Sequence, residues 1–586
     1  MKNIRWTKRI TAFLLALFLG AVQVDAAVTT GGYGTNYSEK EHSEVPLDEM
    51  SRELFDQDAF DSAVEELSGL VGRRGREDRA RELYRVILRE TDNLYTQYML
   101  LTLDYYRDVE NEEVAARYEE SGSLLMEVGN TAAETLRDLL NSEYYGEVIR
   151  EEMGPENAAA FEEYESVTEE EGYLAEKEME LIREYEEAAM QDYDDYREEN
   201  QVLGGIYLEL VEVRTKLAQI QGYDNYADYA YECGYYRDYT VEDVERLRES
   251  VKEELVPLYE ECFSYALDKD MGSLFLDRAE SSEEMLDSLG TILEEIHPDV
   301  GAAYEYFRTF ELYDIEPDGK KMDMGYTVEL PAYGDAYIYD NGYGTYQDYF
   351  TMIHEFGHFT SVFYEDIHYL YSVVNMDVSE IHSQGLEVLC WPYYEELVPG
   401  MGEAMQAYVV YEMLINIISC CIYDEIEQEI YRNPDMSLEE LNQAVVDISS
   451  QYGYDQTLDQ YQWVELNHLY QQPFYVISYA TSALAALEIL ELSEADRDQA
   501  LEVYMDISAS GTETPYCAVL EECGLRNIFE EGSVAETAEG IASILDLTVP
   551  ERQRTEKGII KSILDGLAEW AAQLESSEWE TLWDRL

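Results

Sequence analysis

Apolar residues recur at helical spacing along most of the chain, and only one short region departs from this pattern. From about residue 51 to 235, from about 240 to 313, and again from Thr345 to the end, apolar positions repeat every three to four residues, which predicts helices. Segment 162–200 is very acidic but keeps Tyr and Leu at helical spacing, so its charges belong on the solvated face of long helices. The pattern predicts a mainly α-helical protein.

The exception lies just before Thr345. Segments 326–330 and 336–339 are β-type and are followed by Asn341-Gly342, a turn signal. We expect a small antiparallel sheet here, next to a helix that Thr345 and Asp348 open as a capping box. Two interpretations of 336–341 stay open: an edge strand that pairs with an extended peptide, or a structural hairpin.

Length indicates more than one structural unit, because 586 residues exceed what one hydrophobic core organises. A second helical region begins near Tyr239, where Thr240 and Asp243 have the spacing of a helix cap. We therefore divide the chain into a signal peptide, a loose linker, an N-terminal helical lobe, a catalytic domain and a C-terminal helical extension. Their predicted ranges are 1–26, 27–50, 51–235, 236–550 and 551–586.

The first 26 residues have the layout of a secretory signal. Four basic residues precede an apolar stretch at 10–22, and Val24-Asp25-Ala26 offers small residues for cleavage. Thirteen apolar residues are short for a bilayer, so an uncleaved anchor is the weaker alternative. We expect a secreted, extracellular protein, with cell-surface association left open. We expect no later apolar run to be long enough for a membrane helix, so no stable insertion should follow signal removal.

Charge narrows the possible partners. The net charge of −88 disfavours nucleic acid and anionic membranes and favours cationic ligands. The seven cysteines are odd in number and lack paired metal spacing, so no disulfide framework is indicated, although pairing of Cys517 with Cys523 is left open.

The strongest chemical signal is His354-Glu355-Phe356-Gly357-His358. Histidines four apart on a helix leave the same face, so two imidazoles can converge on one zinc ion. Glu355 can then reach a zinc-bound water as general base. Four of the seven histidines lie between 354 and 382, which strengthens this interpretation.

A catalytic zinc needs a third protein ligand. A metzincin would continue with Gly at 361 and His at 364, but this chain has Ser361 and Tyr364. Glu380 and Glu387 lie seven apart on one helix stripe, so one can bind metal while the other orients a ligand imidazole. His382 and His368 are interpreted as structural residues.

These motifs resemble the family of thimet oligopeptidase and oligoendopeptidase F. The order of strand, His-Glu-Phe-Gly-His helix and Glu-Ile-His-Ser-x-x-x-Glu carries the resemblance, and it is most specific at 350–392. Looser matches are segment 337–341, Arg214 to Ala218, and Gly222 to Tyr226. The resemblance implies a two-lobed helical clamshell around a deep channel that admits short unstructured peptides.

By position, the resemblance makes His354, His358 and Glu380 ligands of one Zn²⁺, Glu355 the base and Glu387 the partner of a ligand histidine. It also indicates His468, Tyr475 and Tyr479, in the stretch from Asn467 to Ala480, for binding the oxyanion and substrate backbone. Packing is the alternative role for each tyrosine, because the chain has 52 of them.

Together these patterns predict a secreted zinc endopeptidase that cleaves oligopeptides, with a preference for cationic ones. A zinc exopeptidase of the dipeptidyl carboxypeptidase type and a catalytically silent peptide-binding protein remain as alternatives.

Overall fold

A computed structural model gives the fold, and it describes residues 42–548 with short gaps. The gaps are 155–157, 159–168, 190, 192, 194, 277, 279, 323, 365–367, 369, 371–375, 454–459 and 510–513. The predicted signal peptide at 1–26 and the C-terminal extension at 551–586 lie outside the described residues. The other predicted domain boundaries stay predictions.

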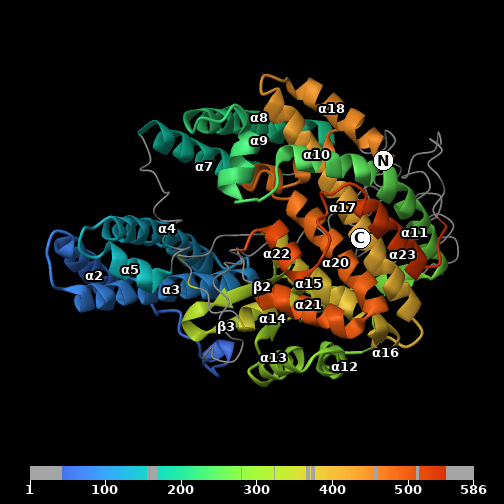
Figure 1. The fold of residues 1–586 in the computed structure, drawn as a ribbon, viewed down its shortest axis with the longest axis horizontal. Coiled ribbons are helices and arrows are strands. Elements are labelled where there is room, and N and C mark those ends of the chain that lie inside the picture. Colours follow the sequence, from blue (N-terminus) through green and yellow to red (C-terminus); the bar gives the residue numbers. More distant parts are fainter. Residues whose placement is uncertain are drawn as a thin grey trace.

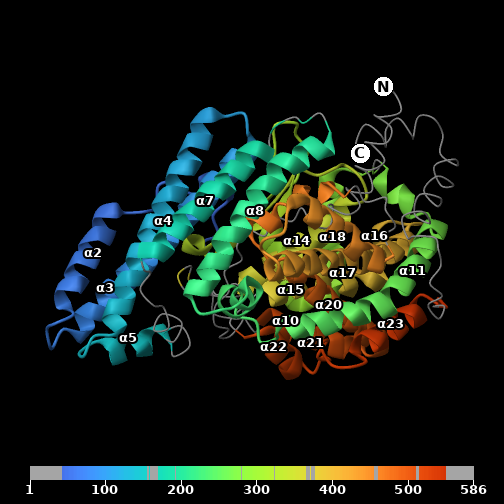
Figure 2. The same cartoon turned by 90° about the horizontal axis from the view of Figure 1, so that it is seen from above.

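The N-terminal helices form two groups (Figure 1). One group packs together, and its helix α3 contacts the small sheet; its members are α2 (Gln57–Leu70), α3 (Glu77–Arg107), α4 (Glu112–Leu140) and α5 (Gly146–Met153). The other group packs against helices from the C-terminal half; its members are α7 (Glu169–Ala189), α8 (Tyr196–Ile220) and α9 (Tyr226–Tyr229). In the view from above, α7 and α8 run between α4 and the main body (Figure 2).

Residues 42–50 are packed, so this part of the predicted linker is not loose. Ser43 Oγ donates to Asp335 Oδ2 at 2.6 Å, and His42 Nδ1 lies 2.7 Å from the carbonyl oxygen of Gly334. Leu47 and Met50 are buried in the core. The segment therefore packs against the connection between strands β2 (Gly325–Leu330) and β3 (Asp335–Asp340).

The second region begins as expected. Thr240 caps α10 (Val241–Ser250) in a full capping box with Asp243. The helices that follow are α11 (Val256–Asp268), α12 (Ser282–Ile296) and α13 (Pro298–Thr309).

The sheet lies where the apolar alternation placed it, with one difference. Strands β2 (Gly325–Leu330) and β3 (Asp335–Asp340) pair antiparallel, as predicted. A two-residue strand, β1 (Tyr313–Asp314), adds a parallel pairing, so the sheet is mixed with the order β1-β3-β2. Since β3 is the central strand, the interpretation of 336–341 as an edge strand is wrong.

Helix α14 (Asp348–Tyr364) packs on both β2 and β3 and also on α15 (Met376–Leu389). The predicted capping box is not formed, because Thr345 Oγ1 accepts from the backbone N–H of Gln347 instead. Asp348 accepts the N–H groups of Tyr343 and Gly344 and pairs with Arg278 at 3.0 Å. The helix start is therefore fixed by the preceding loop and by a distant arginine.

The C-terminal half is a core of packed helices. α17 (Gly402–Arg432) and α20 (Ile477–Ala495) pack together, and α15 packs on α20. The remaining helices are α16 (Tyr394–Leu397), α18 (Leu438–Gln451), α19 (His468–Gln471), α21 (Arg497–Ala509), α22 (Tyr516–Cys523) and α23 (Ser533–Ile544).

Helix α17 corrects one expectation about apolar runs. It is long and apolar enough to cross a membrane by length and composition, but most of its apolar window is buried inside the protein. It serves as a core helix. All seven cysteines are free, Cys517 and Cys523 included.

Candidate metal centre

Three side chains from two helices converge on one point. His354 and His358 leave the same face of α14, and Glu380 projects from α15. One ligand atom from each lies within 4.8 Å of the others. Glu380 Oε2 is 3.4 Å from His354 Nε2 and 3.5 Å from His358 Nε2. The predicted trio is thus brought together.

A glycine in the motif allows the two helices to come this close. A Cβ built on Gly357 would lie 2.5 Å from the carbonyl oxygen of His382 and 2.6 Å from the Cα of Ser383. Real Cβ atoms do not approach backbone atoms so closely. Gly357 therefore sets the spacing between α14, which carries both histidines, and α15, which carries Glu380.

The imidazole of His354 is oriented from its far side. Its Nδ1 lies 2.7 Å from Glu387 Oε1. With Nδ1–H donated to that carboxylate, Nε2 is left as the free nitrogen facing Glu380 and His358. Glu387 thus occupies the predicted supporting position, seven residues after Glu380.

The donor set fits a zinc ion. Two imidazole nitrogens and one carboxylate are a known ligand set for catalytic zinc. His354 Nε2 is buried and has no hydrogen-bond partner among the described residues. Burial alone would raise the pKa of Glu380, but His358 and His354 outweigh it, so the pKa lies below its usual range. The carboxylate is therefore charged, as a metal ligand must be.

Glu355 is anchored by one oxygen and free at the other. Thr327 Oγ1, on strand β2, lies 2.7 Å from Glu355 Oε2 and 2.9 Å from the Glu355 carbonyl oxygen. Glu355 Oε1 is buried without a hydrogen-bond partner among the described residues. Burial raises the pKa of Glu355, and the two histidines and Thr327 oppose that shift. This arrangement suits a carboxylate that exchanges protons.

The downstream residues form a compact aromatic cluster. The rings of His468 and Tyr475 are stacked with centroids 5.2 Å apart, and Tyr479 meets Tyr475 edge-on at 5.1 Å. Tyr475 lies before α20, so the two tyrosines do not share one helix although they are four residues apart. A turn at the start of α20 nevertheless brings the rings together.

The cluster is buried and lies within electrostatic range of Glu380. Burial lowers the pKa of His468 to about 4, and Glu380 partly offsets this shift. Burial also raises the pKa of Tyr475, with smaller contributions from Tyr479 and Glu380. At neutral pH the cluster therefore offers a neutral imidazole and protonated phenol groups, which are hydrogen-bond donors.

The other two histidines of this region are not among the three converging side chains. His368 Nε2 lies 2.7 Å from the carbonyl oxygen of Leu88, and His368 Nδ1 accepts the N–H of Leu370 at 3.0 Å. His382 is buried, and burial lowers its pKa to about 3.

Sequence reasoning missed the residues that support the site from a distance. Thr327 was seen only as part of a strand. Arg237 forms a buried ion pair with Asp377 on α15, and neither residue belongs to a recognisable sequence motif. The only sequence signal for Thr327 was its place in the predicted β segment 326–330.

Comparison with known proteins agrees with this geometry. Residues 294–538 match the model of peptidase family M3. No curated protein matches the chain. Among solved structures, PZ peptidase A with an inhibitor is 20% identical with a TM-score of 0.71, and the match covers 85% of this chain and 99% of that one.

A Bacillus anthracis protein assigned as an oligoendopeptidase F is 18% identical with a TM-score of 0.66, covering 86% of this chain and 98% of that one. At such identities these matches show the fold: this chain is a mainly α-helical, two-lobed clamshell. Residues 294–538, which include the candidate metal centre, thus match peptidase family M3 and confirm the resemblance to the oligopeptidases.

Proposed function

We propose that this protein is a secreted, zinc-dependent endopeptidase that hydrolyses short unstructured peptides. The observation that carries the proposal is the arrangement around His354, His358 and Glu380. Their ligand atoms lie within 4.8 Å of one another, and Glu355 beside them keeps one carboxylate oxygen free. The match to peptidase family M3 supports the reaction class.

His354, His358 and Glu380 would hold the ion, and Glu387 would keep His354 in the required tautomer. Zinc bound there would polarise the scissile carbonyl and make water more acidic. Glu355 takes a proton from the attacking water and delivers it to the departing amine. Thr327 keeps the Glu355 carboxylate in place during both transfers.

The cluster of His468, Tyr475 and Tyr479 supplies donors to the oxygen that becomes negatively charged. Tyr475 OH and His468 Nδ1 are buried and have no hydrogen-bond partner among the described residues. Donors that are already oriented stabilise such an oxyanion by several kcal/mol, because they need no reorganisation during the reaction.

The decisive experiment is Glu355→Gln, which preserves the shape of the side chain but cannot accept the proton. We expect one zinc per chain by elemental analysis and a kcat about 10²–10⁴-fold lower than that of the wild type. Removal of zinc by a chelator should abolish wild-type hydrolysis, and zinc should restore it. Normal activity of the zinc-loaded Glu355→Gln variant would refute the mechanism.

The exopeptidase alternative is tested with a peptide blocked at both ends. Internal cleavage supports the endopeptidase, whereas cleavage that requires a free C-terminus supports the dipeptidyl carboxypeptidase type. The silent binding protein predicts tight peptide binding without turnover when zinc is bound. The free oxygen of Glu355 favours turnover over silence.

Secretion rests on residues 1–26, whose basic and apolar segments have the order of a signal peptide. We expect the mature protein in the medium with its N-terminus after Ala26. Recovery of the full-length chain in the cell membrane would support the anchor instead.

A further inference from the structure

Buried ionisable side chains hold the segment that carries His468, Tyr475 and Tyr479. Arg214 on α8 is fully buried and donates to the carbonyl oxygens of Leu469, at 2.9 Å, and Tyr470. Glu427 on α17 accepts the N–H of Phe474 at 2.9 and 3.0 Å. Leu469 and Phe474 directly adjoin two of the three candidate donors, His468 and Tyr475.

The backbone conformation of Phe474 indicates that contacts from other helices hold this segment. Its φ is +65°, in the left-handed region that residues other than glycine rarely adopt. Such a conformation is strained and persists where surrounding contacts require it. Both its N–H and its carbonyl group are held, by Glu427 and Arg237.

Arg237 contacts the residues next to both candidate tyrosines. Its Nη2 donates to the Phe474 carbonyl oxygen at 3.0 Å and to Ser478 Oγ at 2.9 Å. Phe474 and Ser478 are the residues immediately before Tyr475 and Tyr479. One nitrogen therefore fixes the backbone beside one candidate donor and the side chain beside the other.

The same guanidinium also contacts the helix of the third candidate ligand. Arg237 Nε lies 3.3 Å from Asp377 Oδ2. Asp377 precedes Glu380 by three residues, so it lies about one turn away on α15. Asp377 Oδ1 also accepts from Tyr239 OH at 2.9 Å and from Thr481 Oγ1 at 3.0 Å.

A cage of aromatic rings fixes the position of this guanidinium. The rings of Tyr231, Tyr235 and Tyr239 have centroids 4.4, 4.5 and 5.5 Å from Arg237 Cζ. The side chain of Arg237 has no exposed surface. The planar fork of an arginine can reach Asp377 and Phe474 at once, whereas a lysine provides a single point charge.

We propose that Arg237 is a positioning residue, which holds Tyr475 and Tyr479 at a fixed place relative to Glu380 so that their hydroxyl groups meet the oxyanion. The inference rests on the proposed peptidase function. It predicts that Arg237 acts on the chemical step through the two tyrosines, without touching the substrate itself.

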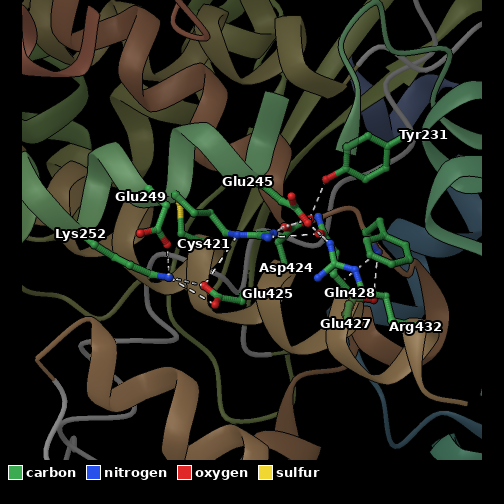
Figure 3. A network of polar contacts seen from close by, with 12 residues as sticks. Tyr231, Glu245, Glu249, Lys252, Cys421, Asp424, Glu425, Glu427, Gln428 and Arg432 are labelled. Atoms are coloured by element: carbon green, nitrogen blue, oxygen red, sulfur yellow. Dashed lines mark hydrogen bonds and ion pairs between the residues drawn. The ribbon is translucent and has the colours of Figure 1, made fainter. Parts of the chain in front are cut away.

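A second buried arginine provides the matched control. Arg248 on α10 pairs with Asp424 and donates to Gln428 Oε1 at 3.1 Å, both on α17. Asp424 and Glu425 belong to a polar network in which Lys252 also takes part (Figure 3). Arg248 thus has a comparable burial and an acidic partner, but its described contacts do not include residues 474–479. Its partner Asp424 accepts from Tyr231 OH at 2.6 Å, so Arg248→Lys also reports any effect that reaches Arg237 through this one ring of the cage.

The first test compares Arg237→Lys with Arg248→Lys in zinc-loaded protein. We expect Arg237→Lys to lower kcat by about 10–100-fold, less than the outright loss of an oriented oxyanion donor, while KM and zinc content stay within about 3-fold. Arg248→Lys should lower the thermal midpoint but keep kcat within about 3-fold. Equal kcat for Arg237→Lys and wild type overturns the inference.

The second test places Arg237→Lys in a Tyr475→Phe/Tyr479→Phe background. If Arg237 acts through the tyrosines, its substitution should change kcat by less than about 3-fold there. The same 10–100-fold loss in both backgrounds would indicate a purely structural role and overturn the inference. An unchanged kcat after Tyr475→Phe/Tyr479→Phe would also overturn it.

If Arg237→Lys fails to fold, Ser478→Ala serves instead, because it removes one acceptor without leaving a buried charge unpaired. It should lower kcat by about 3–10-fold at constant zinc content, in keeping with loss of one hydrogen bond. An unchanged kcat overturns the inference. Absence of hydrolysis by zinc-loaded wild type would overturn the proposed function itself, which separates the two failures.

Discussion

The hydroxyl group of Thr327 holds the carboxylate of Glu355 and influences its pKa. It lies 2.7 Å from Glu355 Oε2 and stabilises the charged carboxylate, opposing the rise that burial causes in the pKa of Glu355. Thr327→Val keeps the shape and the strand preference but removes the donor. A hydrogen bond to a charged group contributes about 1.5–3 kcal/mol, so kcat should fall by about 10-fold or more.

The sign of the pH effect follows from the same bond. Without it the pKa of Glu355 rises, so the acidic limb of the kcat/KM profile should move to higher pH. Thr360→Val is the control, because Thr360 is buried on α14 and, among the described residues, its hydroxyl bonds only the Phe356 carbonyl oxygen, at 2.8 Å. An acidic limb at the wild-type position in Thr327→Val would contradict the assigned role of the hydroxyl.

His368 predicts a separate dependence of stability on pH. Burial lowers the pKa of His368 to about 4, and the hydrogen bond to the Leu88 carbonyl oxygen partly offsets this shift. Protonation would also break the hydrogen bond that Nδ1 accepts from the backbone N–H of Leu370. The unfolded chain, with a pKa near 6.5, binds the proton first, so stability is full above pH 6.5. It should fall by about 3 kcal/mol as the pH falls from 6.5 to 4.

NMR titration of labelled histidine and urea unfolding across this range measure the effect. His368→Gln should flatten the stability curve between pH 6.5 and 4. A titration of His368 near 6.5 in the folded protein would refute the prediction.

At the scale of helices, the close approach of α14 and α15 brings the three candidate metal ligands together. Gly357→Ala would place a methyl group 2.5 Å from a backbone oxygen of α15 and push the helices apart. We expect zinc affinity to fall by at least about 10-fold, as when a ligand's support is disturbed, together with a lower thermal midpoint. Zinc titration and thermal unfolding measure both.

Gly205→Ala on α8 is the matched control, because nothing lies within 4 Å of the added methyl group. There the substitution should raise stability by about 0.5–1 kcal/mol and leave zinc affinity unchanged. Wild-type zinc affinity in Gly357→Ala would show that the helix spacing is not limiting.

The same scale shows why some features could be predicted from the sequence. Strands β2 and β3, the helix with His354 and His358, and the cap at Thr240 depend on neighbours within a few residues, so periodicity sufficed. The two-residue strand β1 was missed because it has too few residues for an alternation.

The supporting contacts could not be predicted, since they join residues far apart in the chain. Asp348 has the spacing of a capping partner, yet Arg278, 70 residues away, engages it instead. Arg237 reaches Asp377 across 140 residues and Phe474 across 237. Only the tertiary structure brings such pairs together.

At the scale of the whole molecule, charge should decide which peptides reach the site fastest. The chain carries 127 acidic and 39 basic residues, a net charge of −88, so its field attracts cations over long range. For matched peptides that differ only in charge, we expect kcat/KM at low salt to be about 10-fold or more higher for the basic one. The difference should reside in the association step.

Salt provides the test of this interpretation. The Debye length falls from about 30 Å at 0.01 M to about 3 Å at 1 M, so the advantage of the basic peptide should vanish as salt rises. A preference that persists at 1 M salt would instead indicate direct contacts between the basic peptide and acids at the site. Equal kcat/KM for the acidic and basic peptides at 0.01 M would show that the net charge serves solubility alone.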